Sequence, residues 1–338
     1  MCDKNANRDT LLEVRDLQVE FRMRQGTLHA ARGVNFSLKK GEILGLVGES
    51  GCGKSVTANT ILGLIGKKKH EHVSGEILFH GEDVLKQSEK EQQKIRGNKI
   101  SMIFQDPMTA LDPVVKVGKQ VGEGLEIHQK KSKKEAFKEA VRQLVGVGIP
   151  SAEERAQDYP FQFSGGMRQR AVIASALMCQ PEILIADEPT TALDVTIQAQ
   201  ILDLLRKLRE EKEVAILLIT HDLGVVAELC DTVAVMYAGE IVEKAPVQEI
   251  FASPLHPYTQ GLLKCIPILG KRDKLVPIPG QPPKLYEEKA GCMFAQRCPY
   301  ACEACKEETV FYEAAPEHFV ACRRAREADV QNGGNDEQ

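Results

Sequence analysis

Two kinds of hydrophobic pattern alternate along the chain. Short apolar runs such as 42–47 (EILGLV) and 214–220 (VAILLIT) are typical of strands buried in a parallel sheet. Other segments have the pattern of helices, and the alternation of the two predicts an α/β protein with a parallel sheet. The predicted strands are 11–21, 28–38, 42–47, 183–186, 214–220 and 232–237, and the predicted helices are 53–64, 115–128, 134–147 and 164–178.

The pattern also indicates how the chain is divided. Residues 107–180 are mainly helical in pattern and interrupt the strands, so we interpret them as a helical subdomain. From residue 246 onward prolines recur, which is typical of a connector, and a Cys-rich piece follows. We therefore expect one domain over residues 1–250 and a C-terminal extension over residues 251–338.

Length, apolar content and charge exclude several classes of protein. The chain has 338 residues, of which 43% are hydrophobic. This suffices for a large core and about two domains, and it excludes disordered, collagen-like and small disulfide-stapled chains. The formal net charge of −4 argues against a nucleic-acid partner. No apolar run approaches the ~18 residues of a membrane-spanning helix, and the N-terminal residues lack a signal-peptide pattern, so we expect a cytoplasmic location.

A glycine-rich stretch after the apolar run 42–47 has the pattern of a phosphate-binding loop. Residues 48–55 read GESGCGKS, which matches G-x-x-x-x-G-K-[ST] between a predicted strand and a predicted helix. Glycines let successive N–H groups turn toward phosphate oxygens, and the helix N-terminus adds partial positive charge. Lys54 is expected to reach the β- and γ-phosphates, and Ser55 to ligate Mg²⁺. The nucleotide-binding prediction covers Gly48, Ser50, Gly51, Cys52, Gly53, Lys54, Ser55 and Val56.

A second stretch supplies two carboxylates. Residues 183–188 read ILIADE, an apolar strand that ends in Asp187 and Glu188. Because the C-terminal ends of parallel strands face the ligand crevice, Asp187 is expected to hold Mg²⁺ and Glu188 to act as general base on the attacking water. The alternative is a strand that ends in a solvated acidic turn, and the phosphate-binding loop makes it the less favoured interpretation.

Residues 163–170 (FSGGMRQR) have the pattern of a helix start. Ser164 can cap this helix, and the two glycines expose backbone N–H groups to an anion. One γ-phosphate is not easily held by two loops of one chain, so we interpret this helix end as a site for a nucleotide bound to another subunit. A plain N-capped helix is the alternative.

Together these stretches resemble the ATPase of the ABC-transporter family over residues 11–265. The resemblance rests on the phosphate-binding loop, Gln105, FSGGMRQR, ILIADE, ALD at 192–194 and ITHD at 219–222, in the family's order. It implies a P-loop NTPase of the ABC type, with a parallel sheet core, an antiparallel β subdomain and a helical subdomain. It also implies ATP hydrolysis with Mg²⁺.

The resemblance assigns roles to single residues. Phe21 is implied to stack on adenine, with a core phenylalanine as the alternative. Gln105 is implied to contact Mg²⁺ and the attacking water, and His221 to contact the γ-phosphate. Mg²⁺ would then be bound by Ser55, Gln105 and Asp187. Contacts with a partner subunit and its ATP are implied for Ser164, Gly165, Gly166, Gln169 and Asp194.

The same resemblance implies an assembly. Two ATPase subunits, either copies of this chain or paralogues, would hold two ATP molecules head to tail at their interface. Closure would depend on γ-phosphate contacts that hydrolysis removes. Two transmembrane permease subunits and an extracytoplasmic solute-binding protein are implied as further partners, with this chain at the cytoplasmic face of the membrane.

The C-terminal residues indicate a branch of the family. Residues 253–263 (SPLHPYTQGLL) and 277–283 (PIPGQPP) are similar to the extension of peptide and nickel importers, most of all the D-type ATPase of dipeptide and oligopeptide permeases. An ATPase that powers peptide import is therefore the leading hypothesis. An importer of nickel or another solute is an alternative. A soluble ABC-type ATPase acting on DNA or ribosomes is less favoured, because the chain has one ATPase unit and no heptad run.

Five of the ten cysteines lie between residues 292 and 322 of this extension. Four of them follow the pattern C-x5-C-x6-C-x16-C, and four thiolates can hold an iron–sulfur cluster or a zinc ion. The resemblance to the permease branch favours a [4Fe–4S] cluster on Cys292, Cys298, Cys305 and Cys322. Cys302, a fifth thiol three residues before Cys305, leaves zinc open as the alternative.

Overall fold

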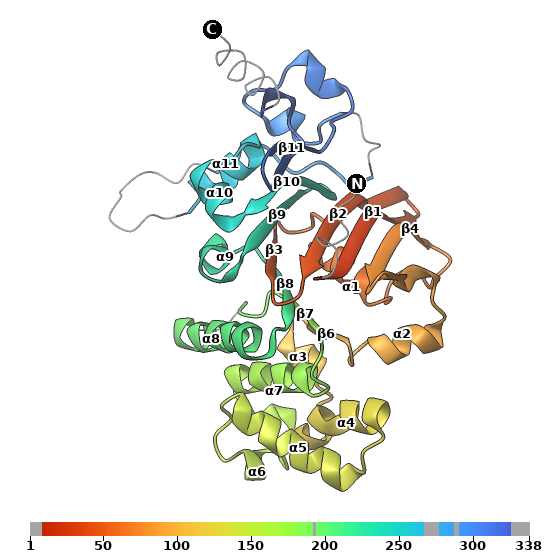
Figure 1. Cartoon of the computed structure of the whole chain (residues 1–338), viewed down its shortest axis with the longest axis vertical. Helices are drawn as coiled ribbons and strands as arrows, with labels where there is room; N and C mark the ends of the chain where they lie inside the picture. The colour runs from red at the N-terminus through yellow and green to blue at the C-terminus, as the bar shows by residue number, and fades with distance from the viewer. Residues whose placement is uncertain (1–8, 192–193, 267–276, 287–290, 326–338) are drawn as a thin grey trace.

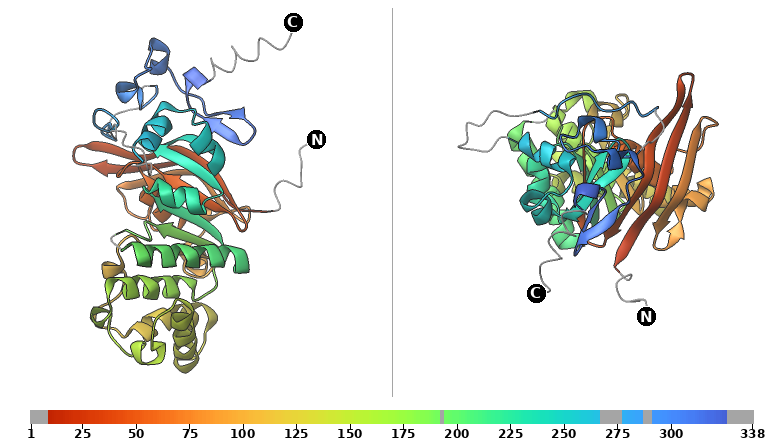
Figure 2. Two further views of the ribbon diagram at one scale, coloured as in Figure 1. Left: turned by 90° about the vertical axis from the view of Figure 1, so that its left-hand side faces the viewer. Right: turned by 90° about the horizontal axis from the view of Figure 1, so that it is seen from above.

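The computed structural model describes residues 9–191, 194–266, 277–286 and 291–325. They form two β-sheets that lie between a group of helices at one end of the molecule and the C-terminal segment at the other (Figures 1 and 2). The larger sheet has the order β11-β12-β10-β9-β3-β8-β7-β6, and the smaller has the order β2-β1-β4-β5. The predicted α/β fold, with a parallel core, an antiparallel sheet and a helical region, is confirmed.

The smaller sheet is built on a long hairpin. Strands β1 (Thr10–Met23) and β2 (Gly26–Lys39) pair antiparallel from Thr10 opposite Lys39 to Met23 opposite Gly26. They extend the two predicted strands to the tight turn that joins them. The neighbouring strands β4 (Glu71–Phe79) and β5 (Glu82–Asp83) had no prediction, because β4 is polar and only partly buried along most of its length.

The central strands of the larger sheet are apolar because both faces of the sheet are buried there. Side chains alternate across a strand, so Ile43 and Val47 of β3 enter one core, while Leu44 and Leu46 enter the other. The second core lies between the two sheets, and the first lies under the helices. The strands are β3 (Ile43–Val47), β6 (Ile100–Ile103), β7 (Ile183–Asp187), β8 (Ala215–Thr220), β9 (Thr232–Tyr237), β10 (Glu240–Pro246), β11 (Tyr312–Ala315) and β12 (His318–Val320).

The predicted helices at 115–128, 134–147 and 164–178 correspond to α4, α5 and α7, which pack on one another. Helix α5 begins after Ser132, whose hydroxyl accepts the N–H of Glu135 and forms a capping box with it. The helices are α1 (Lys54–Ile61), α2 (Glu89–Ile95), α3 (Pro107–Ala110), α4 (Val117–Gln129), α5 (Lys133–Gly146), α6 (Ala152–Arg155), α7 (Gly165–Leu177), α8 (Val195–Lys212), α9 (Leu223–Leu229), α10 (Val247–Ala252) and α11 (Pro257–Lys264), with 3-10 turns η1 (Val84–Lys86), η2 (Pro160–Gln162), η3 (Ala295–Arg297) and η4 (Glu303–Lys306).

The C-terminal segment joins the larger sheet through an antiparallel pair of strands. Strand β12 pairs with β10, with Val320 opposite Glu243. The Glu243 carboxylate is fully buried and accepts hydrogen bonds from the backbone N–H groups of Leu255 and His256, and its Oε1 lies 2.7 Å from Nε2 of His318. This buried carboxylate therefore ties β10, the start of α11 and β12 together.

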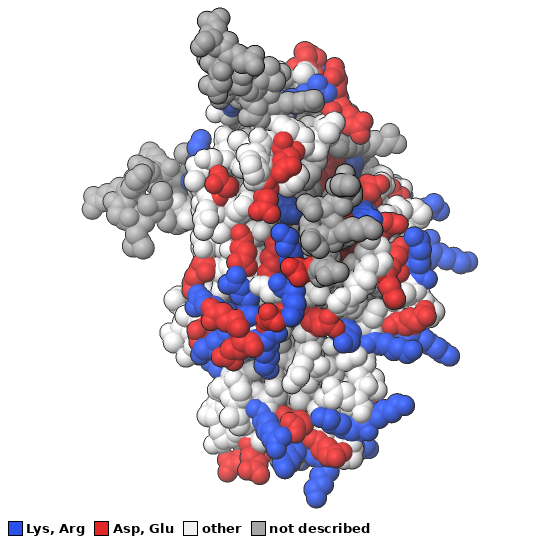
Figure 3. Space-filling view, in the orientation of Figure 1, with Lys and Arg blue, Asp and Glu red and all other residues white. Residues whose placement is uncertain are grey.

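The surface carries both signs of charge. On the face drawn in Figure 3, Lys and Arg side chains are interspersed with Asp and Glu side chains. Within the described ranges, every helix is too short or too polar to cross a lipid bilayer.

Candidate functional site

The loop between β3 and α1 contains the predicted phosphate-binding residues in a tightly curled backbone. Gly53 has a φ of +109°, and a Cβ there would lie 2.1 Å from the carbonyl oxygen of Ala30. A Cβ on Gly48 would lie 2.1 Å from the carbonyl oxygen of Met236. Both distances are far below van der Waals contact, so only glycine lets the loop fit against β2 and β9.

Lys54 is the first residue of α1, and its ammonium group lies over the inside of this loop. The side chain is buried, and Nζ donates to the carbonyl oxygens of Gly48 (2.8 Å) and Glu49 (3.0 Å). Phosphate oxygens entering the loop can take the place of these carbonyls as acceptors. The two carbonyls thus hold the ammonium group inside the loop.

Asp187, the last residue of β7, lies beside Ser55 at the start of α1. Burial raises the pKa of the Asp187 carboxyl, a hydrogen bond from Ser55 opposes this shift, and the negative charge of Glu188 adds to it. Oδ1 of Asp187 is buried and has no hydrogen-bond partner among the described residues. A buried, unpartnered carboxylate oxygen next to a hydroxyl fits the oxygen ligands that Mg²⁺ requires.

Three side chains converge on Glu188. Its Oε2 accepts hydrogen bonds from Nε2 of Gln105 (2.9 Å) and Oγ1 of Thr191 (2.9 Å), and its Oε1 lies 3.2 Å from Nδ1 of His221. Burial alone would raise the pKa of the carboxyl, but the hydrogen bonds with Thr191, His221 and Gln105 outweigh burial and lower it. The carboxylate is therefore ionised at neutral pH, as a general base must be.

The structure therefore brings together three residues that the sequence analysis selected separately: Gln105, Glu188 and His221. The sequence analysis did not select Thr191, because a threonine in a turn has no distinctive pattern of its own. Its position three residues after Glu188 is the signal that could have found it, and its N–H donates to the Glu188 carbonyl (3.1 Å). Glu188 itself has a φ of +47°, and its N–H donates to the carbonyl oxygen of Ile219 on β8 (2.8 Å). This left-handed backbone turns the carboxylate out of the strand direction.

The stretch FSGGMRQR lies at the start of α7, which packs on α3, α4, α5 and β6. Helix α1, which follows the phosphate-binding loop, packs on β2 and β7 instead. Ser164 caps α7, and its hydroxyl accepts the N–H of Met167 (3.3 Å). Gly165 has open space beside it, because a Cβ there would meet no atom within 4 Å outside its own turn of helix. Gly166 lies against Ile197 of α8, where Asp194 caps the helix by accepting the Ile197 N–H (3.0 Å).

Gln169 and Phe21 are placed differently from an open ligand-facing position. Gln169 is 2% exposed, and its Nε2 donates to the carbonyl oxygen of Pro189 (2.7 Å), in the turn after Glu188. Its side chain therefore supports that turn in this structure. Phe21 lies on β1 opposite Leu28 of β2, and its ring packs partly against the core between the sheets. This contact fits the alternative interpretation of Phe21 as a core residue.

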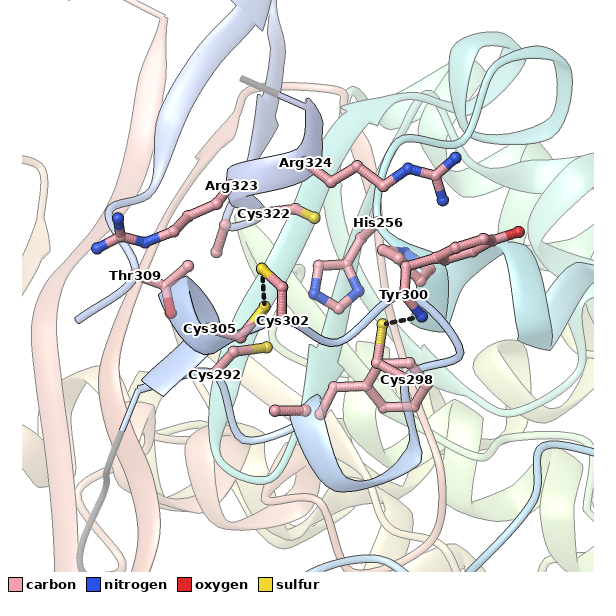
Figure 4. Close-up of a pocket in the computed structure, with 14 residues that line it drawn as sticks. His256, Cys292, Cys298, Tyr300, Cys302, Cys305, Thr309, Cys322, Arg323 and Arg324 are labelled. Carbon is pink, nitrogen blue, oxygen red and sulfur yellow. Dashed lines mark hydrogen bonds between the residues drawn. The ribbon is translucent and has the colours of Figure 1, made fainter. Parts of the chain in front are cut away.

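A second candidate site involves residues 291–325, the Cys-rich segment at the C-terminal end of the described chain. All five of its cysteines line one pocket of about 380 Å³, together with His256, Phe294, Tyr300 and Arg324 (Figure 4). The Sγ atoms of Cys302 and Cys305 are 3.7 Å apart, and Sγ of Cys298 accepts the N–H of Tyr300 (3.4 Å). Burial and, to a smaller extent, the neighbouring thiols of Cys305, Cys322 and Cys298 raise the pKa of Cys292 to about 11.

The thiols do not form a finished ligand set. Among the described residues, no group of three or more His, Cys, Asp or Glu side chains has the arrangement of a metal site. The [4Fe–4S] prediction is therefore not supported by ligand geometry. What the structure does bear out is narrower: the four predicted thiols, 30 positions apart at most along the chain, share one pocket with Cys302.

Sequence comparisons place these two regions in separate family models. The model described as "ABC transporter" matches residues 31–191, and the one described as "Oligopeptide/dipeptide transporter, C-terminal region" matches residues 242–305. The chain is 54% identical over 298 residues to the dipeptide transport ATP-binding protein DppD of Bacillus subtilis, covering 88% of this chain and 89% of that protein. It is 49% identical over 315 residues to the oligopeptide transport ATP-binding protein OppD of Escherichia coli, covering 93% of each.

A solved structure resembles the fold as well. The ATP-binding cassette MJ0796, in a dimeric post-hydrolysis state bound to ADP and Pi, matches with a TM-score of 0.63 at 29% sequence identity. The match covers 70% of this chain and 98% of MJ0796. The cassette-like part therefore accounts for most of this chain, and the remainder lies outside the cassette of that protein.

Proposed function

The chain belongs to the ABC transporter family, and from that premise we propose that it is the ATP-hydrolysing subunit that powers import of dipeptides or oligopeptides through a membrane permease. The observation that carries the enzymatic part is the convergence of Gln105, Thr191 and His221 on the ionised Glu188, next to a preformed phosphate-binding loop. The match to the C-terminal region model supports peptides as the cargo.

ATP binds with its phosphates in the loop of residues 48–55. The N-terminus of α1 and the ammonium group of Lys54 meet the β- and γ-phosphates there. Ser55, Gln105 and Asp187 would hold Mg²⁺, which neutralises charge on those phosphates. Asp187 is suited to this role, because its buried Oδ1 lacks any partner among the described residues.

Glu188 then accepts a proton from the attacking water, while Gln105 and His221 orient the carboxylate and the water. In this structure both side chains are bound to Glu188, so they must turn toward water and γ-phosphate as the site fills. Ser164, Gly165 and Gly166 would contact the nucleotide of a second ATPase subunit, with Asp194 at the same interface. Two permease subunits and a solute-binding protein complete the assembly, which places the chain on the cytoplasmic face of the membrane.

We also propose a metal centre in the cysteine pocket, with Cys292, Cys298, Cys305 and Cys322 as its ligands. The donor types are suitable, because the four thiols share one pocket, and three of them raise the pKa of Cys292 by a repulsion that a common cation would relieve. An iron–sulfur cluster is the proposed occupant, and zinc is the alternative. Anaerobically purified protein should be brown, with about four irons per chain. Colourless protein with stoichiometric zinc would replace the cluster by zinc.

Transport by the reconstituted importer tests the cargo. The chain, its second ATPase, its permease subunits and its solute-binding protein are expressed in an amino-acid auxotroph that lacks peptide importers. We expect growth on a dipeptide that contains the missing amino acid, and none when Glu188 is replaced by Gln. Uptake of nickel in place of peptide would contradict the peptide assignment, and co-purification with ribosomes or DNA would contradict an importer altogether.

A further inference from the structure

A partly buried ion pair joins the Cys-rich segment to the phosphate-binding loop. The Arg297 side chain is 5% exposed, and its guanidinium binds the Glu49 carboxylate through two contacts, Nη1 to Oε2 (2.8 Å) and Nη2 to Oε1 (3.0 Å). Glu49 is the second residue of the loop GESGCGKS, and Arg297 directly precedes Cys298. The same guanidinium donates through Nε to the carbonyl oxygen of Pro279 (2.9 Å).

Aromatic side chains support this contact from behind. The hydroxyl of Tyr258 accepts the N–H of Glu49 (2.9 Å), and the Tyr237 hydroxyl lies 3.4 Å from Nη1 of Arg297. The rings of Tyr237, Tyr258 and Phe294 contact one another, with centroids 4.6 to 5.4 Å apart. Glu49 is thus held twice: Tyr258 of α11 accepts its backbone N–H, and Arg297 of η3 binds its side chain. Both residues lie far along the chain from β3 and α1, the two elements that carry the loop.

We propose that Arg297 is a positioning residue for nucleotide binding, which neutralises Glu49 and holds the phosphate-binding loop in its binding conformation. This inference rests on the proposed function, because it concerns the same loop. It makes nucleotide affinity depend on how the Cys-rich segment is folded, although that segment contributes no residue to the predicted phosphate contacts.

Arg297 acts on nucleotide binding through its charge. A carboxylate next to a site for several phosphate charges repels them, and Lys54, whose Nζ already contacts the Glu49 carbonyl, would be drawn toward a free carboxylate. The bidentate guanidinium removes this competition, because its positive charge and two of its donors are directed at the Glu49 carboxylate. Removal of Arg297 leaves the partly exposed Glu49 carboxylate charged and without this partner, so it would be free to turn toward the loop.

Replacement of Arg297 by Met tests the proposal with the full-length chain. We expect the Kd for ATP, measured by fluorescence titration, to rise roughly tenfold, which corresponds to 1.4 kcal/mol. The Kd for ADP should rise less, because ADP carries less negative charge. The difference between variant and wild type should shrink as salt is raised, because salt screens a repulsion between carboxylate and phosphate.

The second variant adds Glu49→Gln to Arg297→Met. With no charge left on either side, ATP affinity should return to within about twofold of wild type. Arg209→Met is the matched control, since Arg209 pairs with Asp231 and with the carbonyl oxygen of Gly41, away from the loop. It should leave the Kd unchanged. Where Arg297→Met does not fold, Arg297→Lys, which keeps the charge, takes its place with a smaller rise in Kd.

Equal losses for ATP and ADP that salt does not change, with no recovery in the double variant, would overturn the proposal and leave Arg297 a purely structural residue. An unchanged Kd in a folded Arg297→Met protein would overturn it too. Failure of the wild-type chain to bind ATP is a different result, since it would remove the proposed function and not only this inference.

Discussion

The C-terminal end of strand β7 and the Cys-rich segment hold their functional side chains in opposite ways. Asp187 ends, and Glu188 directly follows, a strand whose residues are all buried, so cores on both faces of the sheet set their positions. The thiols of the Cys-rich segment lie in loops around the short turns η3 and η4, where few apolar residues are buried. The positions of the first pair are therefore set by the packed sheet, whereas the second site depends on contacts with the cassette and on what its thiols bind.

The largest effect is expected at the C-terminal end of β7, from Glu188→Gln. Loss of the general base should lower kcat about 10²- to 10⁴-fold while ATP still binds, because the phosphate-binding loop is untouched. Phosphate release and nucleotide titration measure the two properties. Glu228→Gln on the exposed face of α9 is the matched control and should hydrolyse ATP normally. Normal turnover by Glu188→Gln would assign the base to another residue.

Lys54→Ala is expected to act on binding. Its ammonium group already contacts two carbonyls inside the loop, so its loss removes a preformed partner for the phosphates. We expect the Kd for ATP to rise about tenfold or more. The exposed Lys207→Ala on α8 serves for comparison, and equal affinities for both variants would rule out the assigned role of Lys54.

The attachment of the C-terminal segment is probed by Glu243→Gln. Burial would raise the pKa of this carboxyl, but hydrogen bonds from His318 and from the backbone N–H groups of Leu255 and His256 lower it. The folded state thus binds fewer protons than the unfolded state, so this stabilisation is present above about pH 4.3 and is lost as the pH falls through the folded-state pKa.

We therefore expect Glu243→Gln to lower the free energy of unfolding at pH 7 by about 1–3 kcal/mol and to make stability depend less on pH in acid. Denaturant unfolding between pH 3 and 7 measures both. The exposed Glu249→Gln, on the neighbouring α10, should change neither. If the Glu243→Gln protein is as stable as wild type and loses stability in acid to the same extent, the carboxylate does not hold β10, α11 and β12 together.

The smallest effect separates two adjacent thiols. Cys302 is exposed and lies outside the proposed ligand set, so Cys302→Ser should keep the metal content and the melting temperature of wild type. Cys305→Ser should lose metal, because it removes a proposed ligand. Metal analysis of both proteins decides the matter, and metal loss in Cys302→Ser alone would exchange the roles of the two residues.

Much of the fold could be predicted because burial on both faces gives strands such as 42–47 an unmistakable apolar pattern. Strand β4 received no prediction because it is mostly polar. Helix α8 received none although Ile201, Leu202, Leu205 and Leu208 have the apolar spacing of a helix and could have predicted it. At the site, Gln105, Glu188 and His221 could be selected singly from their motifs. The metal centre could be proposed from cysteine spacing alone, but spacing says nothing of Sγ positions, and the thiols share a pocket without a finished ligand geometry among the residues that the structure describes.

By itself the sequence determined the local chemistry of this protein: a glycine-rich loop after a buried strand, a carboxylate pair at a strand end, and a serine-capped helix. These features depend on neighbours in the chain, and local patterns report them. Only the tertiary structure decided that Arg297 meets Glu49, 248 positions away, and that Tyr258 accepts the N–H of the same residue. Contacts at such separation depend on how the segments pack together, which no local pattern records.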